Sequence, residues 1–171
     1  MALTLLGDMI SNRPRRLNGV SYIGYQRYFL TACAALQRPV FNEALLATRV
    51  VAQLLDVATS FEFAVSAYCV MPDHVHALLE GQSERSNFIE FVKRFKQVTG
   101  FEFRRHANHR LWQPGYYERI LRSDEATEAV VRYILENPIR AGLTSKLGEY
   151  AFAGSDRYTL EELISAWDRQ T

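Results

Sequence analysis

The sequence predicts an α+β fold, in which a single domain has a central antiparallel β-sheet flanked by helices. Stretches that alternate between apolar and polar residues interleave with amphipathic helical stretches along the chain. Two strand-like stretches, 61–70 and 74–80, are joined by a Met-Pro-Asp turn, which predicts an antiparallel hairpin. The 171 residues are the size of one domain. We expect this domain at 21–171, after a basic arm at 1–20.

Residue preferences and spacing give the expected elements. Aromatic and β-branched residues place strands at 28–34, 61–70, 74–80 and 116–122. Apolar residues at helical spacing place helices at 42–59, 87–99, 124–137 and 160–167. Alternation in the second strand predicts one shared face for Phe61, Phe63, Val65, Ala67 and Cys69.

Single residues are expected to set three helix ends. Asn42 is expected to cap the first helix, because its side chain can accept from first-turn N–H groups. Gly100 is expected to stop the second helix. Pro138 is expected to end the third, because the residue before a proline is pushed out of helical geometry.

Overall charge says little about partners, because 20 Lys and Arg residues against 19 Asp and Glu leave a net charge of +1. No apolar run approaches the ~18–20 residues of a membrane span, and the N-terminus has the reverse order of a secretory signal. Cys33 and Cys69 lack the spacing of a metal or redox motif and are expected to be small buried side chains. We therefore expect a cytoplasmic protein without a membrane partner.

A His-Val-His sequence is the candidate metal site. Residues two apart on a strand point to the same face, so His74 and His76 present two imidazoles side by side. Two nitrogen ligands suit one divalent cation and leave positions for substrate and water. Such a pair alone is more often ordinary polar residues, and a structural zinc site lacks its cysteines here. Val75, Ala77 and Leu79 face the other way and are expected in the core.

Tyr133 and Asn137 lie four residues apart, on one face of the third expected helix. Tyr133 is at the edge of an apolar stripe formed by Val130, Val131, Ile134 and Leu135. A phenol with a pKa of about 10 is a weak nucleophile, but a metal that polarises a phosphate makes it usable. The Asn137 oxygen would suit Mg²⁺ or Mn²⁺ as a third ligand. Packing and an ordinary helix end are the simpler interpretations, and Tyr116 and Tyr117 compete for the nucleophile role.

A basic stretch with nearby aromatic residues indicates nucleic acid. Its cations, opposed only by Glu102, are Lys93, Arg94, Lys96, Arg104, Arg105 and Arg110. Its aromatic residues are Phe101, Phe103, Trp112, Tyr116 and Tyr117. Cations bind phosphates and exposed rings stack on unpaired bases, although a solvated helix face over core aromatics explains the pattern equally well.

Two smaller groups of residues extend this basic stretch. Arg13, Arg15 and Arg16 in the N-terminal arm could add a second basic patch. His106 and His109 lie within the basic loop, where contact with nucleic acid is their more specific interpretation.

Several runs in one order resemble the single-tyrosine HUH transposases of the IS200-like type, especially the REP-associated tyrosine transposases. AYCVMPDHVHALLE at 67–80 resembles the segment with the two histidines, and YILENPIRAGL at 133–143 resembles the nucleophile helix. WQPGYYERIL at 112–121 is similar to the segment before that helix, and YFLT at 28–31 through RPVF at 38–41 is similar to the first strand and its turn. The resemblance covers about 25–145. Asp73 departs from it, because many relatives carry Asn there.

The resemblance implies a sheet related to the ferredoxin-like arrangement, with His74 and His76 as metal ligands, Tyr133 as nucleophile and Asn137 as third ligand. It implies an enzyme that cuts single-stranded DNA beside REP-like or transposon-end hairpins, with Mg²⁺ or Mn²⁺. The tyrosine would form a 5′-phosphotyrosine link and free a 3′-hydroxyl, and a second 3′-hydroxyl would then join a new strand. A homodimer and a place in the bacterial cytosol or nucleoid are further expectations.

Two other classes of function compete with this enzyme. A DNA-binding protein could keep the fold without cleavage, but the intact His74, His76, Tyr133 and Asn137 argue against a decayed copy. A plain globular or structural metal-binding domain would leave the basic and aromatic stretch unexplained.

Overall fold

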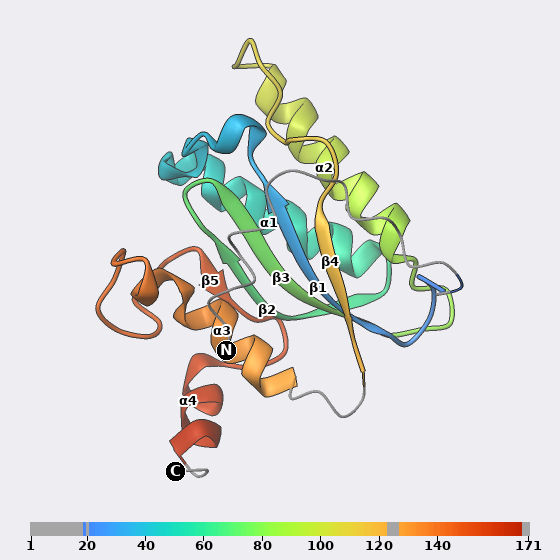
Figure 1. Ribbon diagram of the computed structural model, residues 1–171, viewed down its shortest axis with the longest axis vertical. Helices are drawn as coiled ribbons and strands as arrows, with labels where there is room; N and C mark the ends of the chain where they lie inside the picture. The colour runs from blue at the N-terminus through green and yellow to red at the C-terminus, as the bar shows by residue number, and fades with distance from the viewer. Residues whose placement is uncertain (1–18, 20, 123–126, 169–171) are drawn as a thin grey trace.

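The computed structural model describes residues 19, 21–122 and 127–168, which form one five-stranded antiparallel sheet with helices on both faces (Figure 1). The strand order is β4-β1-β3-β2-β5. The strands are β1 (Arg27–Cys33), β2 (Phe63–Val70), β3 (His74–Gly81), β4 (Tyr117–Leu121) and β5 (Ala153–Gly154). The predicted α+β class is confirmed, and β5 is a strand that the pattern of apolar residues did not predict.

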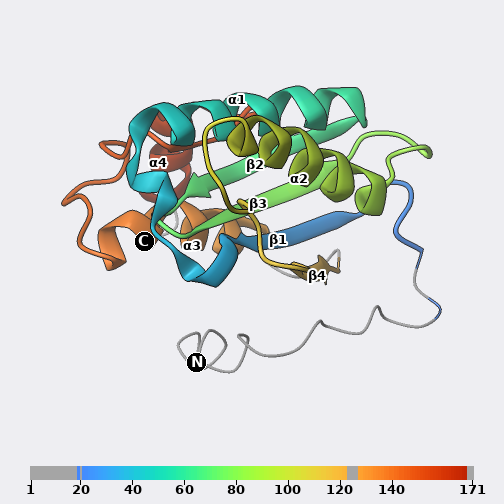
Figure 2. The same cartoon turned by 90° about the horizontal axis from the view of Figure 1, so that it is seen from above.

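The helices divide between the two faces of the sheet. α1 (Ala44–Ser60) and α2 (Phe88–Arg104) cover one face, and α3 (Thr127–Arg140) lies on the other (Figure 2). α4 (Leu160–Asp168) joins the packing of α3, because Trp167 is buried with it. Two 3-10 turns, η1 (Ala35–Gln37) and η2 (Val40–Asn42), connect β1 to α1. The order β1-α1-β2-β3-α2-β4 is that of the ferredoxin-like fold, as the resemblance implied.

Two hydrophobic cores lie on opposite faces of the sheet. On β3, Val75, Ala77 and Leu79 are buried in the core beneath α1 and α2, as predicted. Leu78 belongs to the second core, beneath α3. Alternation along β3 therefore turns His74 and His76 toward the α3 face.

The prediction that the alternating apolar side chains of β2 share one face is wrong, because the strand contains a β-bulge. Phe63 and Val65 lie in the first core, whereas Ala67 and Cys69 lie in the second. The pairing with β3 shifts between Val65 and Ala67. One extra residue in a strand moves all later side chains to the other face, and nothing in the apolar pattern marks it.

Two of the predicted helix ends differ because tertiary packing extends or moves them. Asn42 closes η2 instead of capping α1, whose N-cap is Glu43 without a side-chain hydrogen bond. Gly100 lies inside α2, which continues to Arg104 because Phe103 still packs against the first core.

Pro138 also lies inside its helix, since α3 runs to Arg140. The helix ends at a Schellman motif, in which Leu143 N–H donates to the Pro138 carbonyl at 2.8 Å and Gly142 N–H to the Ile139 carbonyl at 2.9 Å. Gly142 has φ +72°, which this motif requires and glycine adopts without strain. The proline costs α3 one backbone hydrogen bond, and the glycine four residues later is the actual stop.

Some expectations lie outside the described residues, namely the arm with Arg13, Arg15 and Arg16 and the start of the third helix at 124. Within the described part of the chain, no helix has the length and apolar character to cross a membrane.

The stack of aromatic rings beneath α2 makes Phe88 a test of the first core. Phe88 is fully buried and its ring stacks on Tyr28, with centroids 4.1 Å apart. We expect Phe88→Ala to lower the free energy of unfolding by about 3–5 kcal/mol, because it removes this contact and leaves a cavity. Urea denaturation measures the change. Phe101→Ala on the same helix, at a side chain 71% exposed, is the control and should change stability little.

Candidate functional site

The ring nitrogens of two histidines converge on the α3 face of the sheet. The Nε2 atoms of His74 and His76 lie 3.1 Å apart, and the ring centroids lie 4.6 Å apart. β3 is the middle strand, so His76 is almost fully buried, with 1% of its surface exposed. The prediction that both imidazoles share one face is confirmed.

Hydrogen bonds at the opposite ring nitrogens orient both imidazoles. His74 Nδ1 lies 2.7 Å from Asp73 Oδ1, and His76 Nδ1 lies 2.8 Å from Thr31 Oγ1. A carboxylate only accepts, so His74 Nδ1 carries a proton, and in the neutral tautomer with this proton the lone pair is on Nε2. When His76 Nδ1 likewise donates to Thr31, both lone pairs point to one place.

Burial favours the neutral form of His76. It lowers the pKa of His76 well below 6.5, and the nearby His74 and Arg140 lower it further. A neutral imidazole is the form that binds a metal. Two nitrogens 3.1 Å apart could both lie ~2.1 Å from one ion, at an angle of about 95°, which is close to octahedral geometry.

A third protein ligand would have to be of another residue type. Within the described part of the chain, no three His, Cys, Asp or Glu side chains gather closely enough to hold a metal. Asn137 on α3 has a buried Nδ2 atom without a hydrogen-bond partner. Because the two ends of an amide are assigned from their partners, a half-turn of this side chain would place Oδ1 there instead. Two imidazole nitrogens and an amide oxygen one helical turn after Tyr133 are donor types that suit a divalent cation such as Mg²⁺ or Mn²⁺.

α3 brings Tyr133 to the histidines. Its ring makes edge contacts with His76, at 5.8 Å between centroids, and with Phe29, at 5.9 Å. Tyr116 is excluded from this site, because it packs on Phe88 in the first core. Tyr117 follows on β4, where it pairs with Thr31 and so shares the site's face.

Arg140 is a site residue that the sequence analysis missed. Its Cζ lies 4.4 Å from the centroid of the Tyr133 ring, and its Nη2 donates to the Tyr133 carbonyl at 2.5 Å. A cation in this position holds the ring by a cation–π contact. The spacing could have indicated it, since seven residues are two helical turns and place both side chains on one face.

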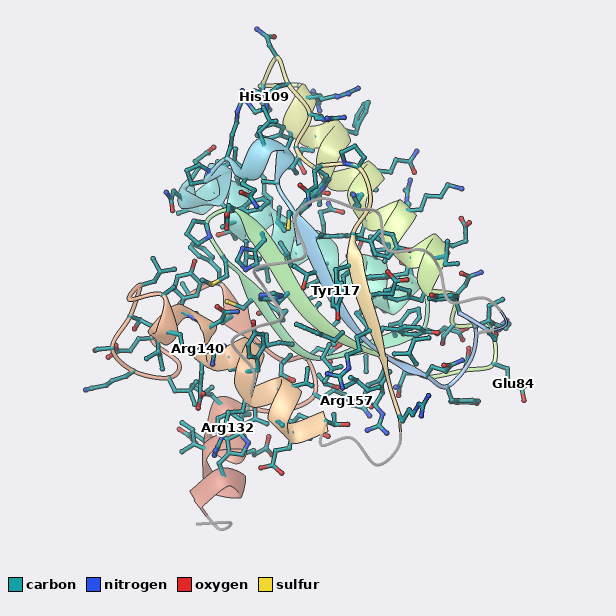
Figure 3. The ribbon with its side chains drawn as sticks, in the orientation of Figure 1. Glu84, His109, Tyr117, Arg132, Arg140 and Arg157 are labelled. Carbon is teal, nitrogen blue, oxygen red and sulfur yellow. The ribbon has the colours of Figure 1, made fainter. Side chains whose placement is uncertain are left out.

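The predicted basic stretch lies away from this site. Most of its cations are on α2 or the following loop, and α2 covers the opposite face of the sheet (Figure 2). Lys93 pairs with Glu90 at 3.3 Å. A cleft of about 360 Å³ between α1 and α2 is lined by His106 and by the Arg49–Glu102 ion pair, again on that face. His109 lies at the loop beyond α2 (Figure 3).

Lys96 differs from the other cations, because it bonds to the protein itself. Its Nζ donates to the carbonyls of Gln113 at 2.8 Å and Gly115 at 2.5 Å. Its predicted role in binding phosphate is therefore replaced by one that holds the loop before β4.

The buried position of Lys96 makes stability depend on pH. Burial lowers its pKa to about 8 from 10.5, so the unfolded chain holds more protons than the folded chain between these values. The free energy of unfolding of the wild type should therefore rise with pH in this window, relative to Lys96→Met, by about 1–3 kcal/mol. The partial solvent contact of Lys96 keeps the gain below that of a fully buried lysine.

Chemical denaturation of both variants, from neutral pH to pH 10.5, measures this difference. It should be flat below about pH 8 and grow above it. A difference that stays constant throughout would show that the Lys96 ammonium has an ordinary pKa.

Comparisons with known proteins identify relatives of similar sequence. A REP-associated tyrosine transposase of Escherichia coli (strain K12) is 26% identical over 104 residues, which are 58% of this chain and 59% of the relative. A Haemophilus influenzae protein described as of the same type is 24% identical over 114 residues, 60% of this chain and 65% of the relative. The chain thus matches these curated relatives over less than two thirds of their length.

A solved structure of a REP-associated tyrosine transposase bound to a REP hairpin has the same fold, with a TM-score of 0.66 at 19% identity. The matched region covers 84% of this chain and 82% of the chain in the solved structure. A family model described as "Transposase IS200 like" matches residues 24–137. This match covers more than half of the 171 residues and includes both histidines, Tyr133 and Asn137. The chain therefore belongs to the IS200-like transposase family.

Proposed function

We propose that this protein is a transposase of the REP-associated tyrosine type, which cuts and rejoins single-stranded DNA beside hairpins. The observation that carries the proposal is the convergence of the His74 and His76 Nε2 atoms, 3.1 Å apart, beside the ring of Tyr133. Family membership supports the reaction class. The REP hairpin bound to the similar structure supports a DNA hairpin, REP-like or from a transposon end, as the substrate.

His74, His76 and the side-chain oxygen of Asn137 would hold Mg²⁺ or Mn²⁺. When bound, the ion would polarise the phosphate that is attacked and stabilise its developing charge. The neutral state of buried His76 and the Asp73–His74 hydrogen bond support this assignment, because both keep Nε2 lone pairs available.

Tyr133 would be the nucleophile. Its phenol oxygen attacks the phosphorus and gives its proton to solvent, while the bond from phosphorus to the 3′-oxygen breaks and that oxygen takes up a proton. The product is a 5′-phosphotyrosine link and a free 3′-hydroxyl. Attack by a second 3′-hydroxyl reverses the step and joins a new strand, so one phosphodiester replaces another and no ATP is needed. Arg140 would orient the Tyr133 ring.

A homodimer and a location in the bacterial cytosol or nucleoid complete the proposal. Sedimentation of the protein with and without hairpin DNA tests the first, and imaging of a tagged chain tests the second.

The nucleophile is tested by trapping the covalent intermediate. We expect the full chain, incubated with Mn²⁺ and a library of hairpins with randomised single-stranded flanks, to form a protein–DNA adduct that survives denaturing gels. Tyr133→Phe should form none, because it lacks the attacking oxygen. Tyr158→Phe, at an exposed tyrosine before α4, is the control and should react as the wild type does.

Other outcomes of this trapping would change the assignment. An adduct that persists in Tyr133→Phe and maps to Tyr117 would move the nucleophile. Salt-sensitive DNA binding without any adduct would favour a DNA-binding protein that does not cleave.

The contact of Asp73 with His74 gives a separate prediction on metal affinity. Asp73→Ala removes the acceptor that orients His74, and we expect it to weaken Mn²⁺ binding about 10–100-fold. Asp73→Asn keeps an oxygen that accepts from Nδ1–H, so its loss should be much smaller. Calorimetric titration with Mn²⁺ compares the two, and equal losses would show that the negative charge of Asp73, not its hydrogen bond, matters.

A further inference from the structure

The pairing of β4 with β1 places Tyr117 in the same cross-strand row as His76, one of the two candidate metal ligands. Tyr117 pairs with Thr31 on β1, and Thr31 pairs with His76 on β3. Paired residues of an antiparallel sheet point to the same face. The Tyr117 ring therefore lies on the site's face, two strands from His76, which is about 10 Å at ~4.8 Å per strand.

On the β1 and β4 side of this face, α3 contacts Arg27 and Phe29 of β1 and shares the second core with Leu121 at the far end of β4 from Tyr117. α3 packs on β2 and, less extensively, on β3. Figure 3 shows Tyr117 over β1 and β4, whereas Arg140 lies at α3. Tyr117 makes no contact with another aromatic ring among the described residues, and its side chain is half-buried.

The other aromatic residues of the basic stretch are committed elsewhere or lie on α2. Trp112 is buried and donates from Nε1 to Thr99 at 2.8 Å. Phe103 and Tyr116 pack against the first core. Phe101 is exposed but belongs to α2, on the opposite face. Of the five, Tyr117 is the one on the face of the histidines.

A bulge held by Lys96 fixes this orientation. Trp112 bridges to Ala34 and Tyr117 pairs with Thr31, so residues 113–116 lie opposite only residues 32–33. The two extra residues bulge out between these pairs at Pro114-Gly115, where Gly115 has φ +78°. Lys96 Nζ binds two carbonyls of the bulge. A slip of one residue would put Tyr116 in place of Tyr117.

We propose that Tyr117 is a stacking platform for one unpaired base next to the phosphate that Tyr133 attacks, and that Lys96 is the positioning residue that holds it there. This inference rests on the proposed function. The Tyr117 ring is too far from His76 to contact a phosphate held by the two histidines. It is close enough to stack on the base of a neighbouring nucleotide. Stacking on an aromatic ring accepts any base, so Tyr117 would position the strand without reading its sequence.

The test uses a single-stranded oligothymidine that carries one 2-aminopurine, whose fluorescence falls when it stacks. The full chain is titrated in the presence of a chelator, so that no cleavage occurs. We expect quenching with the wild type and with Tyr117→Trp. Tyr117→Leu should lose the quenching and bind roughly tenfold more weakly or worse, because the base loses the ring on which it stacks. Tyr158→Leu is the matched control and should behave as the wild type.

Lys96→Met tests the positioning role separately. It should lose quenching as Tyr117→Leu does, while its circular dichroism and its affinity for Mn²⁺ stay those of the wild type. Full quenching in Lys96→Met would overturn the positioning role. Full quenching in Tyr117→Leu, or equal loss in Tyr158→Leu, would overturn the platform.

The adduct assay separates failure of this inference from failure of the proposed function. If hairpin DNA forms the Tyr133 adduct but quenching does not depend on Tyr117, the platform is wrong and the cleavage stands. If quenching depends on Tyr117 but no hairpin forms an adduct, the platform stands and the proposed cleavage is wrong.

Discussion

The register of β3 between its two neighbours is the constraint on which the site depends. Thr31 and Cys69 both pair with His76, so the strands on either side fix which face the histidines occupy. A slip by one residue would bury His74 and His76 beneath α1 and α2, and would turn Val75 toward Tyr133. The Thr31 hydroxyl then reinforces the register, because its contact with His76 Nδ1 exists only in this pairing. One set of backbone hydrogen bonds therefore sets both the fold and the direction of the two histidine Nε2 atoms.

The position of α3 depends on the same face of the sheet, because the helix packs on side chains of β2 and β3 that point to this face. The bulge in β2 turns Ala67 and Cys69 toward α3, and these small side chains give the helix a surface to pack on. The position of its C-terminal end matters as much, because α3 continues past Pro138 to Arg140 and stops only at the Schellman motif with Gly142. A helix that ended at Pro138 would have lost the cation that lies on the Tyr133 ring. The run from Tyr133 to Gly142 thus carries the proposed nucleophile, the proposed third metal ligand Asn137, the Arg140 cation and the glycine that ends the helix.

Local sequence patterns predicted the features that depend on residues nearby in the chain. They missed the features that depend on contacts with residues far away in the chain. The spacing of two in His-Val-His and of four between Tyr133 and Asn137 was sufficient, because strand and helix periods fix those faces. The β2 bulge, the bulge before β4 and the end of α2 were not predictable in this way, since each is set by a partner elsewhere in the chain. Lys96 shows the limit most clearly. Its charge suggested DNA, but the carbonyls that it binds come from a loop that only the fold brings near.

Few buried polar side-chain atoms of the described residues lack a hydrogen-bond partner, and the Asn137 amide is one of them. Buried polar atoms normally find partners, because an unpaired one costs about 1–3 kcal/mol. Here the Asn137 amide is buried without one, and two imidazole nitrogens face each other at 3.1 Å. The hydrophobic cores on both faces of the sheet are extensive enough to offset such a local cost. A sequence selected for stability alone would place apolar side chains at these positions, so their polarity is itself an argument that the site binds and reacts.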